Sequence, residues 1–258
     1  MGVHPSAIVN RGAELASGVE VGPYSIIGKN VKIGKDTIIE SHVIIDGHTE
    51  IGENNHIYHF TSIGFPPQDV GYRGENTRVR IGNNNLIREY VTINRATTKE
   101  NWETVIGNDN FFMAYAHVAH DCRLGNGIIM SNVATLGGHT KVGDYVFMGG
   151  LVAVHQFVRI GDYAYIGGKV AVAQDIPPFM LAAGAGRARL FGPNQKGLRR
   201  QGFSRGKIEG LKKAYRLIWR ETKRFSEGIR RVKEEIEPFP ELDMLIDFIS
   251  SSRRGITR

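Results

Sequence analysis

Two histidines and an aspartate lie within five residues of one another in the stretch MAYAHVAHDC, residues 113–122. An imidazole beside a carboxylate could take a proton from a nucleophile as a general base. The same side chains, His117, His120 and Asp121, could instead bind a metal ion such as zinc. Histidines can also simply fill a polar wall. Local spacing does not separate these possibilities, so the elements that position the side chains must decide.

The composition is that of a soluble globular protein. The chain has 258 residues, of which 41% are hydrophobic and 23% are charged. No apolar run is long enough to cross a membrane, so we expect no membrane insertion. Cys122 is the only cysteine, which excludes an internal disulfide and favours a cytoplasmic location. The small residues at equivalent positions indicate that Cys122 fills the core and is not a nucleophile.

Basic residues concentrate in the last quarter of the chain. Residues 187–258 hold 19 Lys/Arg against 9 Asp/Glu, or +10, whereas residues 1–186 hold 14 against 17, or −3. This asymmetry favours an acidic partner or a phosphorylated ligand. Nucleic acid is not expected, because Tyr215 and Trp219 have core spacing and no nucleic-acid motif is present.

A six-residue repeat begins at Ala7 and dominates the chain. Of 25 hexads, 24 have Ile, Leu, Val or Met at the third place, as in VKIGKD and VRIGDY, and Phe112 fills the remaining one. A hexapeptide period is typical of a parallel β-helix, in which three hexads form one coil of 18 residues. We therefore predict a β-helix over residues 1–194 whose third-place side chains point inward.

The repeat also places the polar residues in space. Residues 67–78 and 97–103 interrupt it, and both insertions leave from the same corner of the predicted coil. Residues 18 apart lie on adjacent coils, so Asp121 is expected to stack on His139. The histidines that gather at this edge over three coils are His117, His120, His139 and His155.

Helical spacing replaces the repeat after residue 195. Leu211, Tyr215 and Ile218 mark one face of a helix that Ser204 can cap. The stretches SEGIRRVKEEI and FPELDMLIDFISSS predict two more helices. We expect residues 195–258 to form a basic α-helical domain that covers one end of the β-helix.

Two alternatives to a histidine base follow from the residues. One is a zinc-dependent hexapeptide-repeat enzyme of the γ-carbonic anhydrase type. Against it, His-x-x-His on a strand and turn does not fix both rings on one metal, and no cysteine pair is present, so we expect no metal. The other alternative is a β-helix that binds partners without catalysis.

Several stretches together carry a family resemblance: HPSAIV, HDC, GGH, AVHQFVRIG, AQDIPPFM and GLRRQGFS, with the basic C-terminal tail. They resemble the UDP-N-acetylglucosamine O-acyltransferase family over essentially the whole chain. The resemblance implies a left-handed β-helix that forms a homotrimer. It also implies transfer of a 3-hydroxyacyl group from acyl carrier protein to the 3-position of a UDP-sugar, in the first step of lipid A biosynthesis. No cofactor is implied beyond the phosphopantetheine that carries the acyl group.

The resemblance assigns roles by position. His120 resembles the general base, Asp121 the carboxylate that orients it, and Gly138 the backbone donor to the thioester oxyanion. Gly168, followed by Lys169, resembles the residue that limits acyl length. The positions that resemble contacts to the sugar, the pantetheine or the nucleotide are Gln68, Asp69, His117, His139, His155, Gln156, Asn194 and Arg200.

Five positions depart from the family's pattern. Asn94 and Ala96 replace two residues of an HRGT run, Gly71 replaces a lysine, Lys196 a glutamate and Gln201 an arginine. The first two leave open whether the acceptor carries a 3-hydroxyl or a 3-amino group. The changes near Lys196 bear on the nucleotide contacts.

Overall fold

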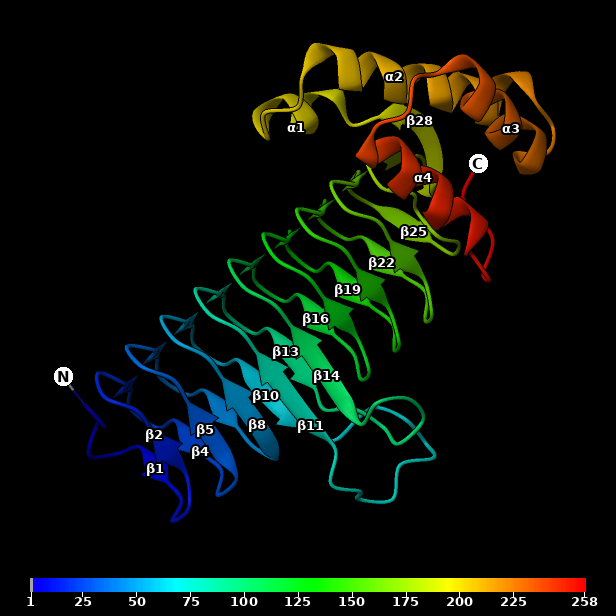
Figure 1. Ribbon diagram of the computed structural model, residues 1–258. Helices are drawn as coiled ribbons and strands as arrows, with labels where there is room; N and C mark the ends of the chain where they lie inside the picture. The colour runs from blue at the N-terminus through cyan, green and yellow to red at the C-terminus, as the bar shows by residue number, and fades with distance from the viewer. Residues whose placement is uncertain (1) are drawn as a thin grey trace.

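Short parallel strands wind around one axis in the computed structural model, which describes residues 2–258 (Figure 1). The fold is a left-handed parallel β-helix with three flat sides and a group of helices at its C-terminal end. Both features were predicted. None of the helices within residues 2–258 is long and apolar enough to cross a membrane.

Three sheets make up the sides. Sheet 1 contains, in spatial order, β1 (Ile8–Val9), β4 (Ile26–Ile27), β7 (Ile44–Ile45), β10 (Ser62–Phe65), β13 (Thr92–Asn94), β16 (His117–Val118), β19 (Thr135–Leu136), β22 (Ala153–Val154), β25 (Val170–Val172) and β27 (Gly186–Arg187). Sheet 2 contains β2 (Glu14–Leu15), β5 (Val31–Ile33), β8 (His48–Ile51), β11 (Arg78–Ile81), β14 (Glu103–Ile106), β17 (Arg123–Leu124), β20 (Lys141–Val142) and β23 (Arg159–Ile160).

Sheet 3 completes each coil. It contains β3 (Glu20–Val21), β6 (Ile38–Ile39), β9 (His56–Ile57), β12 (Leu86–Ile87), β15 (Phe111–Phe112), β18 (Ile129–Met130), β21 (Phe147–Met148), β24 (Tyr165–Ile166), β26 (Met180–Ala183) and β28 (Arg189–Pro193). The last strand, β28, runs antiparallel to β26. The antiparallel strand β28 therefore covers the C-terminal edge of sheet 3, in addition to the helices at this end of the β-helix.

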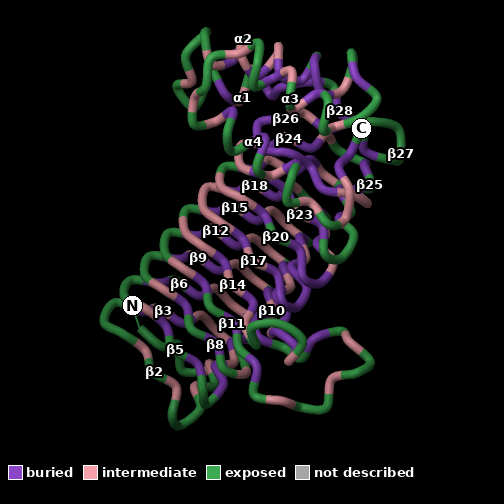
Figure 2. Tube along the Cα trace, turned by 45° about the vertical axis from the view of Figure 1, so that its right-hand side comes forward, coloured by how far each residue is buried: buried purple, intermediate pink, exposed green. Residues whose placement is uncertain are grey.

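The register is the one that the repeat predicts. On sheet 1, Ile63 pairs with Ile93, Ile93 with Val118, and Val118 with Leu136. These third-place side chains are fully buried, and the same burial pattern recurs coil after coil (Figure 2). Stacked aliphatic side chains thus form one continuous core along the axis.

The corners between sheets need a left-handed backbone. Among residues 2–258, nineteen residues other than glycine have a positive φ, and they recur at equivalent places in successive coils. We call the turns from sheet 1 to sheet 2 the histidine corner, which holds Asp121, His139 and Phe157. The turns from sheet 2 to sheet 3 form the asparagine corner, with Asn54 and Asn84. The turns from sheet 3 to sheet 1 form the aromatic corner, which holds Tyr24, His42, Phe60, Tyr90, Tyr115, Val133, Leu151 and Lys169.

Both insertions leave the β-helix at the histidine corner, as predicted. The first joins β10 to β11, the second joins β13 to β14, and the two project together (Figure 1). Arg95 connects them, because its guanidinium donates to the Gly64 carbonyl (2.9 Å) and to the Tyr72 hydroxyl (2.9 Å). Lys99 adds an ion pair with Asp69.

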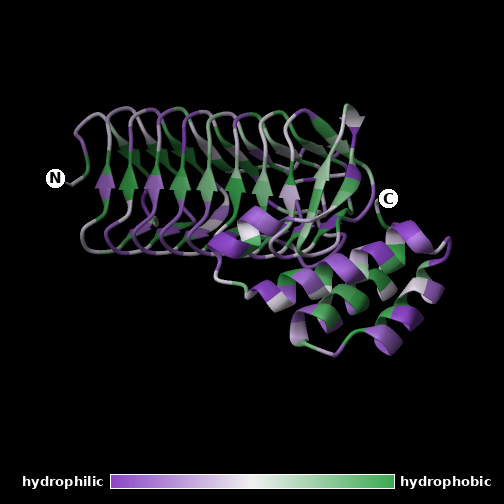
Figure 3. Cartoon of the chain, turned by 90° about the horizontal axis from the view of Figure 1, so that it is seen from above, coloured by the Kyte–Doolittle hydropathy of each residue, from purple (hydrophilic) through white to green (hydrophobic). Residues whose placement is uncertain are grey.

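The helices lie beside the C-terminal coils (Figure 3). They are α1 (Gln195–Arg200), α2 (Arg205–Tyr215), the π-helix η1 (Arg216–Glu221), α3 (Phe225–Glu235) and α4 (Pro240–Ser250). Ser204 caps α2 by accepting from the Lys207 N–H (3.3 Å), which confirms the predicted cap. The helix predicted through Ile218 is confirmed, but its last part is the π-helix η1, and neither this π geometry nor the short helix α1 was predicted.

The last eight residues return to the β-helix. Asp175 accepts the Thr257 N–H (3.0 Å) and donates its own N–H to the Gly255 carbonyl (2.9 Å). Arg254 also donates to the Ala173 carbonyl (3.1 Å). This tail was predicted as part of the helical domain, but it also forms part of the outer wall of the β-helix beside the histidine corner.

Candidate active site

The histidine corner brings together His117, His120 and Asp121. His117 lies on β16, and His120 and Asp121 occupy the turn that follows it. The next coil places Gly138 and His139 directly above them, since the His139 N–H donates to the His120 carbonyl (3.0 Å). The 18-residue period therefore builds the cluster from residues of two coils.

His120 and Asp121 form a buried pair. The Nδ1 atom of His120 lies 2.8 Å from Oδ2 of Asp121. The same carboxylate oxygen accepts the Thr97 N–H (3.0 Å) and the Thr97 hydroxyl (2.7 Å) from the second insertion. The insertion thus fixes the carboxylate, and the carboxylate fixes the ring, so Nε2 is the imidazole atom left to act on a substrate.

The Asp121 carboxyl stays ionised at neutral pH. Burial alone would raise its pKa, but hydrogen bonds from His120 and Thr97 outweigh burial and hold the pKa below its ordinary value. A lowered pKa stabilises the fold above the ordinary carboxyl range, and this stabilisation is lost as the pH falls through the folded pKa. Loss of activity at a pH above the ordinary carboxyl range would therefore not report protonation of Asp121.

His139 closes the other side of the carboxylate. Its Nε2 lies 3.7 Å from Oδ2 of Asp121, and its Nδ1 lies 3.5 Å from Oε2 of Glu100. The ring stacks on Phe157 with centroids 4.3 Å apart and meets His120 edge-on at 5.2 Å. These contacts hold His139 in the wall of the site.

Gly138 is a glycine because the His120 ring occupies the space of a side chain. A Cβ at this position would lie 2.5 Å from Cε1 and 2.7 Å from Nε2 of His120. The carbonyl of Gly138 accepts the Phe157 N–H (3.0 Å), whereas within residues 2–258 no hydrogen bond of the Gly138 N–H is found. The backbone can thus approach a ligand next to the free imidazole nitrogen.

Three buried polar atoms beside this cluster lack hydrogen-bond partners within residues 2–258. They are Oδ1 of Asn94, Oδ1 of Asp121 and Nδ1 of His139. Unsatisfied buried groups are rare in proteins, and a polar ligand is one explanation for several of them in one place. Asn94 and the fully buried Ala96 therefore depart from the family's pattern inside the site itself.

The remaining histidines line the approach to the cluster. Nδ1 of His117 lies 2.6 Å from the Thr92 hydroxyl, and burial, with the nearby His120, lowers the pKa of His117. His155 is exposed and accepts a hydrogen bond from Arg254 (2.7 Å), and Gln156 is exposed next to it. Sequence analysis missed Arg254, because nothing in the local sequence relates the last residues to the histidine corner.

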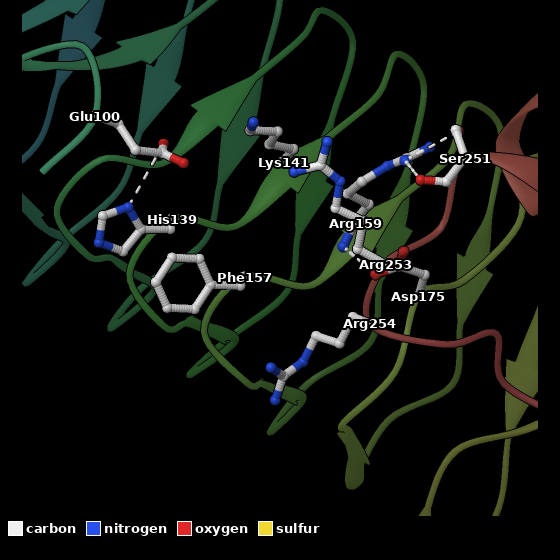
Figure 4. Close-up of a pocket in the computed structure, with 9 residues that line it drawn as sticks. All are labelled: Glu100, His139, Lys141, Phe157, Arg159, Asp175, Ser251, Arg253 and Arg254. Carbon is white, nitrogen blue, oxygen red and sulfur yellow. Dashed lines mark hydrogen bonds and ion pairs between the residues drawn. The ribbon is translucent and has the colours of Figure 1, made fainter.

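A pocket of about 560 Å³ extends from His139 toward the C-terminal tail (Figure 4). Glu100, His139 and Phe157 lie on one side of it. Lys141, Arg159 and Arg253 lie on the other. The pocket gives the histidine corner an open, mostly basic approach.

Other predicted site residues lie outside this cluster. Gln68 and Asp69 are on the first insertion, where Asp69 pairs with Lys99 and also accepts the Gly71 N–H (2.7 Å). Asn194 lies at the asparagine corner, where its side chain donates to the Tyr163 carbonyl (3.1 Å) and accepts from the Gly197 N–H, capping α1.

The remaining predicted residues lie at two other corners. Arg200 ends α1, and Lys196 and Gln201 are exposed close to it. Gly168 and Lys169 lie at the aromatic corner. Within one chain, these residues therefore do not lie beside His120.

A metal could be considered at the same cluster. His120, Asp121 and His139 each offer a ligand atom, and these atoms lie within 4.8 Å of one another. The structure thus pairs His120 with His139 of the next coil and not with His117, which local spacing suggested. The hydrogen bonds of Asp121 to Thr97 and His120 would compete with a metal for Oδ2, so the arrangement fits an oriented base better.

Cys122 is fully buried beneath the site. Burial raises the pKa of its thiol to about 12, and the Sγ atom donates to the Gly137 carbonyl (3.3 Å). A neutral thiol inside the core is not available as a nucleophile. This agrees with its prediction as core filler.

Comparison with known proteins gives a consistent picture. Residues 175–257 match a family model described as "Udp N-acetylglucosamine O-acyltransferase; Domain 2". The chain is 54% identical over 256 residues, 99% of either chain, to the acyl-[acyl-carrier-protein]–UDP-N-acetylglucosamine O-acyltransferase of Thermodesulfovibrio yellowstonii. It is 55% identical over 260 residues, all of either chain, to the Trichlorobacter lovleyi protein of the same name.

Solved structures agree in shape over the whole chain. LpxA from Acinetobacter baumannii superimposes with a TM-score of 0.96 at 43% identity, covering 99% of both chains. The UDP-N-acetylglucosamine acyltransferase of Campylobacter jejuni gives a TM-score of 0.93 at 38% identity, covering 99% of this chain and 98% of the other.

We predict that Gly138→Ala damages the site without unfolding the protein. The added methyl group would collide with His120, so the ring must turn away from Asp121. Acyl transfer should fall about tenfold to a thousandfold, the range for loss of one transition-state donor or base contact. The NMR signals of the His120 ring should shift as well.

Gly206→Ala on α2 provides the control, because a Cβ there meets nothing closer than 4.0 Å. That variant should keep full activity and equal or slightly higher thermal stability. A Gly138→Ala protein with normal activity and unchanged NMR signals of the His120 ring would contradict the assigned geometry.

Proposed function

The chain belongs to the UDP-N-acetylglucosamine O-acyltransferase family, and we propose that it moves an acyl group from acyl carrier protein to the 3-hydroxyl of UDP-N-acetylglucosamine. The observation that carries this proposal is the buried His120–Asp121 pair, whose free Nε2 faces the bare backbone of Gly138. The reaction would be the first step of lipid A biosynthesis, and the single buried thiol suits a reducing cytoplasm.

His120 acts as the general base in this proposal. Its Nε2 takes the proton of the sugar 3-hydroxyl while the oxygen attacks the thioester carbonyl carbon. Asp121 receives the Nδ1–H, selects the tautomer with a free Nε2, and stabilises the imidazolium that forms. The ionised state of Asp121 at neutral pH supports this role.

The Gly138 N–H stabilises the thioester oxyanion in the tetrahedral intermediate. When the intermediate collapses, the carbon–sulfur bond breaks and the imidazolium returns its proton to the leaving thiolate of the carrier's phosphopantetheine. His120 thus first accepts the proton and then returns it, so that atoms and charge balance over the whole reaction. The step uses no cofactor beyond the phosphopantetheine of the donor.

The unsatisfied polar atoms support a sugar in the site. Oδ1 of Asn94 and Oδ1 of Asp121 can each accept a hydrogen bond from a sugar hydroxyl or amide, and His139 can bond with another. The names of the relatives favour a hydroxyl over an amine as the nucleophile. Asn94 provides the polar contact at the position where the family has a histidine.

We propose that the site is shared between copies in a homotrimer. The base lies at the histidine corner, whereas Asn194 and Arg200 lie toward the asparagine corner and Gly168 at the aromatic corner. The aromatic corner is also an exposed apolar edge, where Tyr24, His42, Phe60, Tyr90 and Tyr115 stack with centroids 4.7 to 5.1 Å apart. Closed threefold rotation would cover such an edge and complete the cleft.

The residue that limits the length of the acyl chain is part of the same proposal. Gly168 has no side chain, and a Cβ there would stand 3.0 Å from the Gly150 carbonyl oxygen. We propose that Gly168 leaves room for a long acyl chain and that Lys169 plays the smaller part.

The first prediction concerns the base. His120→Ala should lower turnover by about two to four orders of magnitude while the fold stays intact, as expected when a general base is removed. The assay supplies UDP-N-acetylglucosamine, its 3-amino analogue and hydroxyacyl carrier proteins of several lengths, and products are identified by mass. His48→Ala, at an exposed histidine of an early coil, should remain fully active.

Near-normal turnover of the His120→Ala protein would remove His120 from the role. Stoichiometric zinc in the active wild-type protein, together with loss of activity on chelation, would instead establish the metal alternative. Saturable carrier binding without any product would leave only the binding function.

The second prediction concerns the shared site. His120→Ala and Arg200→Ala proteins should each be inactive alone, but their co-expressed mixture should recover about a quarter of wild-type activity, since random mixing rebuilds that share of sites across copies. Light scattering should give three copies per particle. A mixture that stays inactive, or a fully active monomer, would place the whole site in one chain.

The third prediction concerns acyl length. Gly168→Met should shift the preferred donor toward shorter chains, because each excluded methylene forfeits up to about 0.8 kcal/mol of burial. Turnover on the preferred donor should stay near that of the wild type. The melting temperature of the variant shows whether the new side chain strains the fold where it meets Gly150. If Gly168→Met leaves the preferred acyl length unchanged and Lys169→Ala accepts longer chains, Lys169 is the residue that limits acyl length.

A further inference from the structure

One lysine of the second insertion lies between the buried His120–Asp121 pair and the first insertion. The backbone N–H of Lys99 donates to the Thr97 hydroxyl (3.2 Å), and this hydroxyl donates to the Asp121 carboxylate (2.7 Å). The Lys99 ammonium forms an ion pair with Oδ2 of Asp69. Hydrogen bonds therefore run from Asp121 to Asp69, and Lys99 is the residue that joins the two carboxylates.

Both oxygens of the Asp69 carboxylate are held. Oδ2 accepts a hydrogen bond from the Lys99 ammonium, and Oδ1 accepts the Gly71 N–H (2.7 Å). These two hydrogen bonds, with a smaller contribution from the positive charge of His120, keep the pKa of Asp69 below its ordinary value. The carboxylate is thus ionised at neutral pH, and it lies close enough to His120 to interact with the charge of the ring.

The two insertions are joined by another residue, Arg95. Its guanidinium donates to the Gly64 carbonyl and the Tyr72 hydroxyl, and it lies over the Tyr72 ring, 5.6 Å from the centroid. The Lys99 side chain, by contrast, is 56% exposed, and exposed ion pairs contribute little to stability. The ion pair of Lys99 therefore orients one carboxylate, whereas Arg95 holds the loops together.

Gly71 stands where the family has a lysine, two residues after Asp69. The backbone does not require glycine there, because the φ of Gly71 lies outside the left-handed region. Among residues 2–258, a Cβ at this position would meet only Oδ1 of Asp69 within 4 Å, at 3.0 Å. The loop thus leaves room for a lysine beside the same carboxylate. The cation that this loop lacks is present in the structure, but it comes from Lys99 of the second insertion.

We propose that Lys99 is a positioning residue for the acceptor sugar, because its ammonium orients Asp69 in place of the lysine that the family has at position 71. The inference rests on the proposed function, in which Asp69 contacts the sugar of the UDP-sugar. Each oxygen of the held carboxylate keeps a lone pair for a sugar hydroxyl. A carboxylate that is already fixed loses little conformational entropy when the sugar binds, so Lys99 strengthens acceptor binding.

The test measures acceptor binding and turnover separately. In Lys99→Ala, KM for UDP-N-acetylglucosamine should rise about tenfold while kcat changes less than about twofold, since the lost hydrogen bond acts on binding and not on the base. The Kd of UDP-N-acetylglucosamine, measured by calorimetry without an acyl donor, should rise in parallel. Lys99→Arg keeps a cation beside Asp69 and should stay within about threefold of the wild-type KM.

Gly71→Lys is the decisive second variant. Introduced into Lys99→Ala, it should recover most of the lost affinity, because it returns a cation to Asp69 from the first insertion. In an Asp69→Asn background, Lys99→Ala should cause no further rise in KM, since the interaction between the two side chains is already lost. Lys32→Ala is the matched control. Lys32 is 54% exposed and pairs with Glu14 (3.0 Å) on an early coil, so its loss should change neither KM nor kcat.

Unchanged KM and Kd in Lys99→Ala would overturn the inference. So would a raised KM that Gly71→Lys leaves raised, in a double variant with the melting temperature of the wild type, because Lys99 would then act only through the shape of its loop. If the double variant unfolds, the Asp69→Asn background decides, and an additive rise in KM there would also overturn the inference. Lys99-dependent binding of UDP-N-acetylglucosamine by a wild-type protein that makes no acylated product would overturn the proposed function alone.

Discussion

The whole molecule depends on keeping 18 residues in every coil. Only that period lets each third-place aliphatic side chain stack on its equivalent above and below, and this continuous stack supplies the hydrophobic stabilisation of strands that are mostly two residues long. Strands so short have little stability of their own. The corners must therefore accept left-handed backbone at tyrosine, phenylalanine and histidine, a local cost that the core outweighs. Extra residues can leave only as loops, which is why both insertions bulge out from one corner.

This constraint also builds the active site. Because adjacent coils are in register, Asp121 comes under His139 and Gly138 comes over His120, so the site joins two short stretches of sequence, HDC and GGH, from neighbouring coils. The second insertion then returns Thr97 to Asp121 with two hydrogen bonds, which keep the carboxylate charged in a buried setting. At this cluster the regular β-helix thereby has a polar site that does not follow the repeat. The orphaned atoms of Asn94, Asp121 and His139 are consistent with a site that is completed by its substrate.

The three corners have different chemistry although one repeat produces them. The histidine corner is polar and partly buried, the asparagine corner carries side-chain amides that bond from coil to coil, and the aromatic corner exposes stacked rings. A triangular coil presents these edges in three directions, so residues that must cooperate can meet only when copies associate.

The sequence by itself determined the architecture, because the third-place pattern is periodic and local and needs no knowledge of distant contacts. It likewise determined the register that brings Asp121 to His139, the corner from which both loops leave, and the helix cap at Ser204. Only the tertiary structure decided what lies outside the period: Thr97 bonding Asp121, Arg254 reaching His155, and the tail returning to Asp175. Such contacts join residues far apart in the chain, and their energies depend on distances that no local pattern encodes.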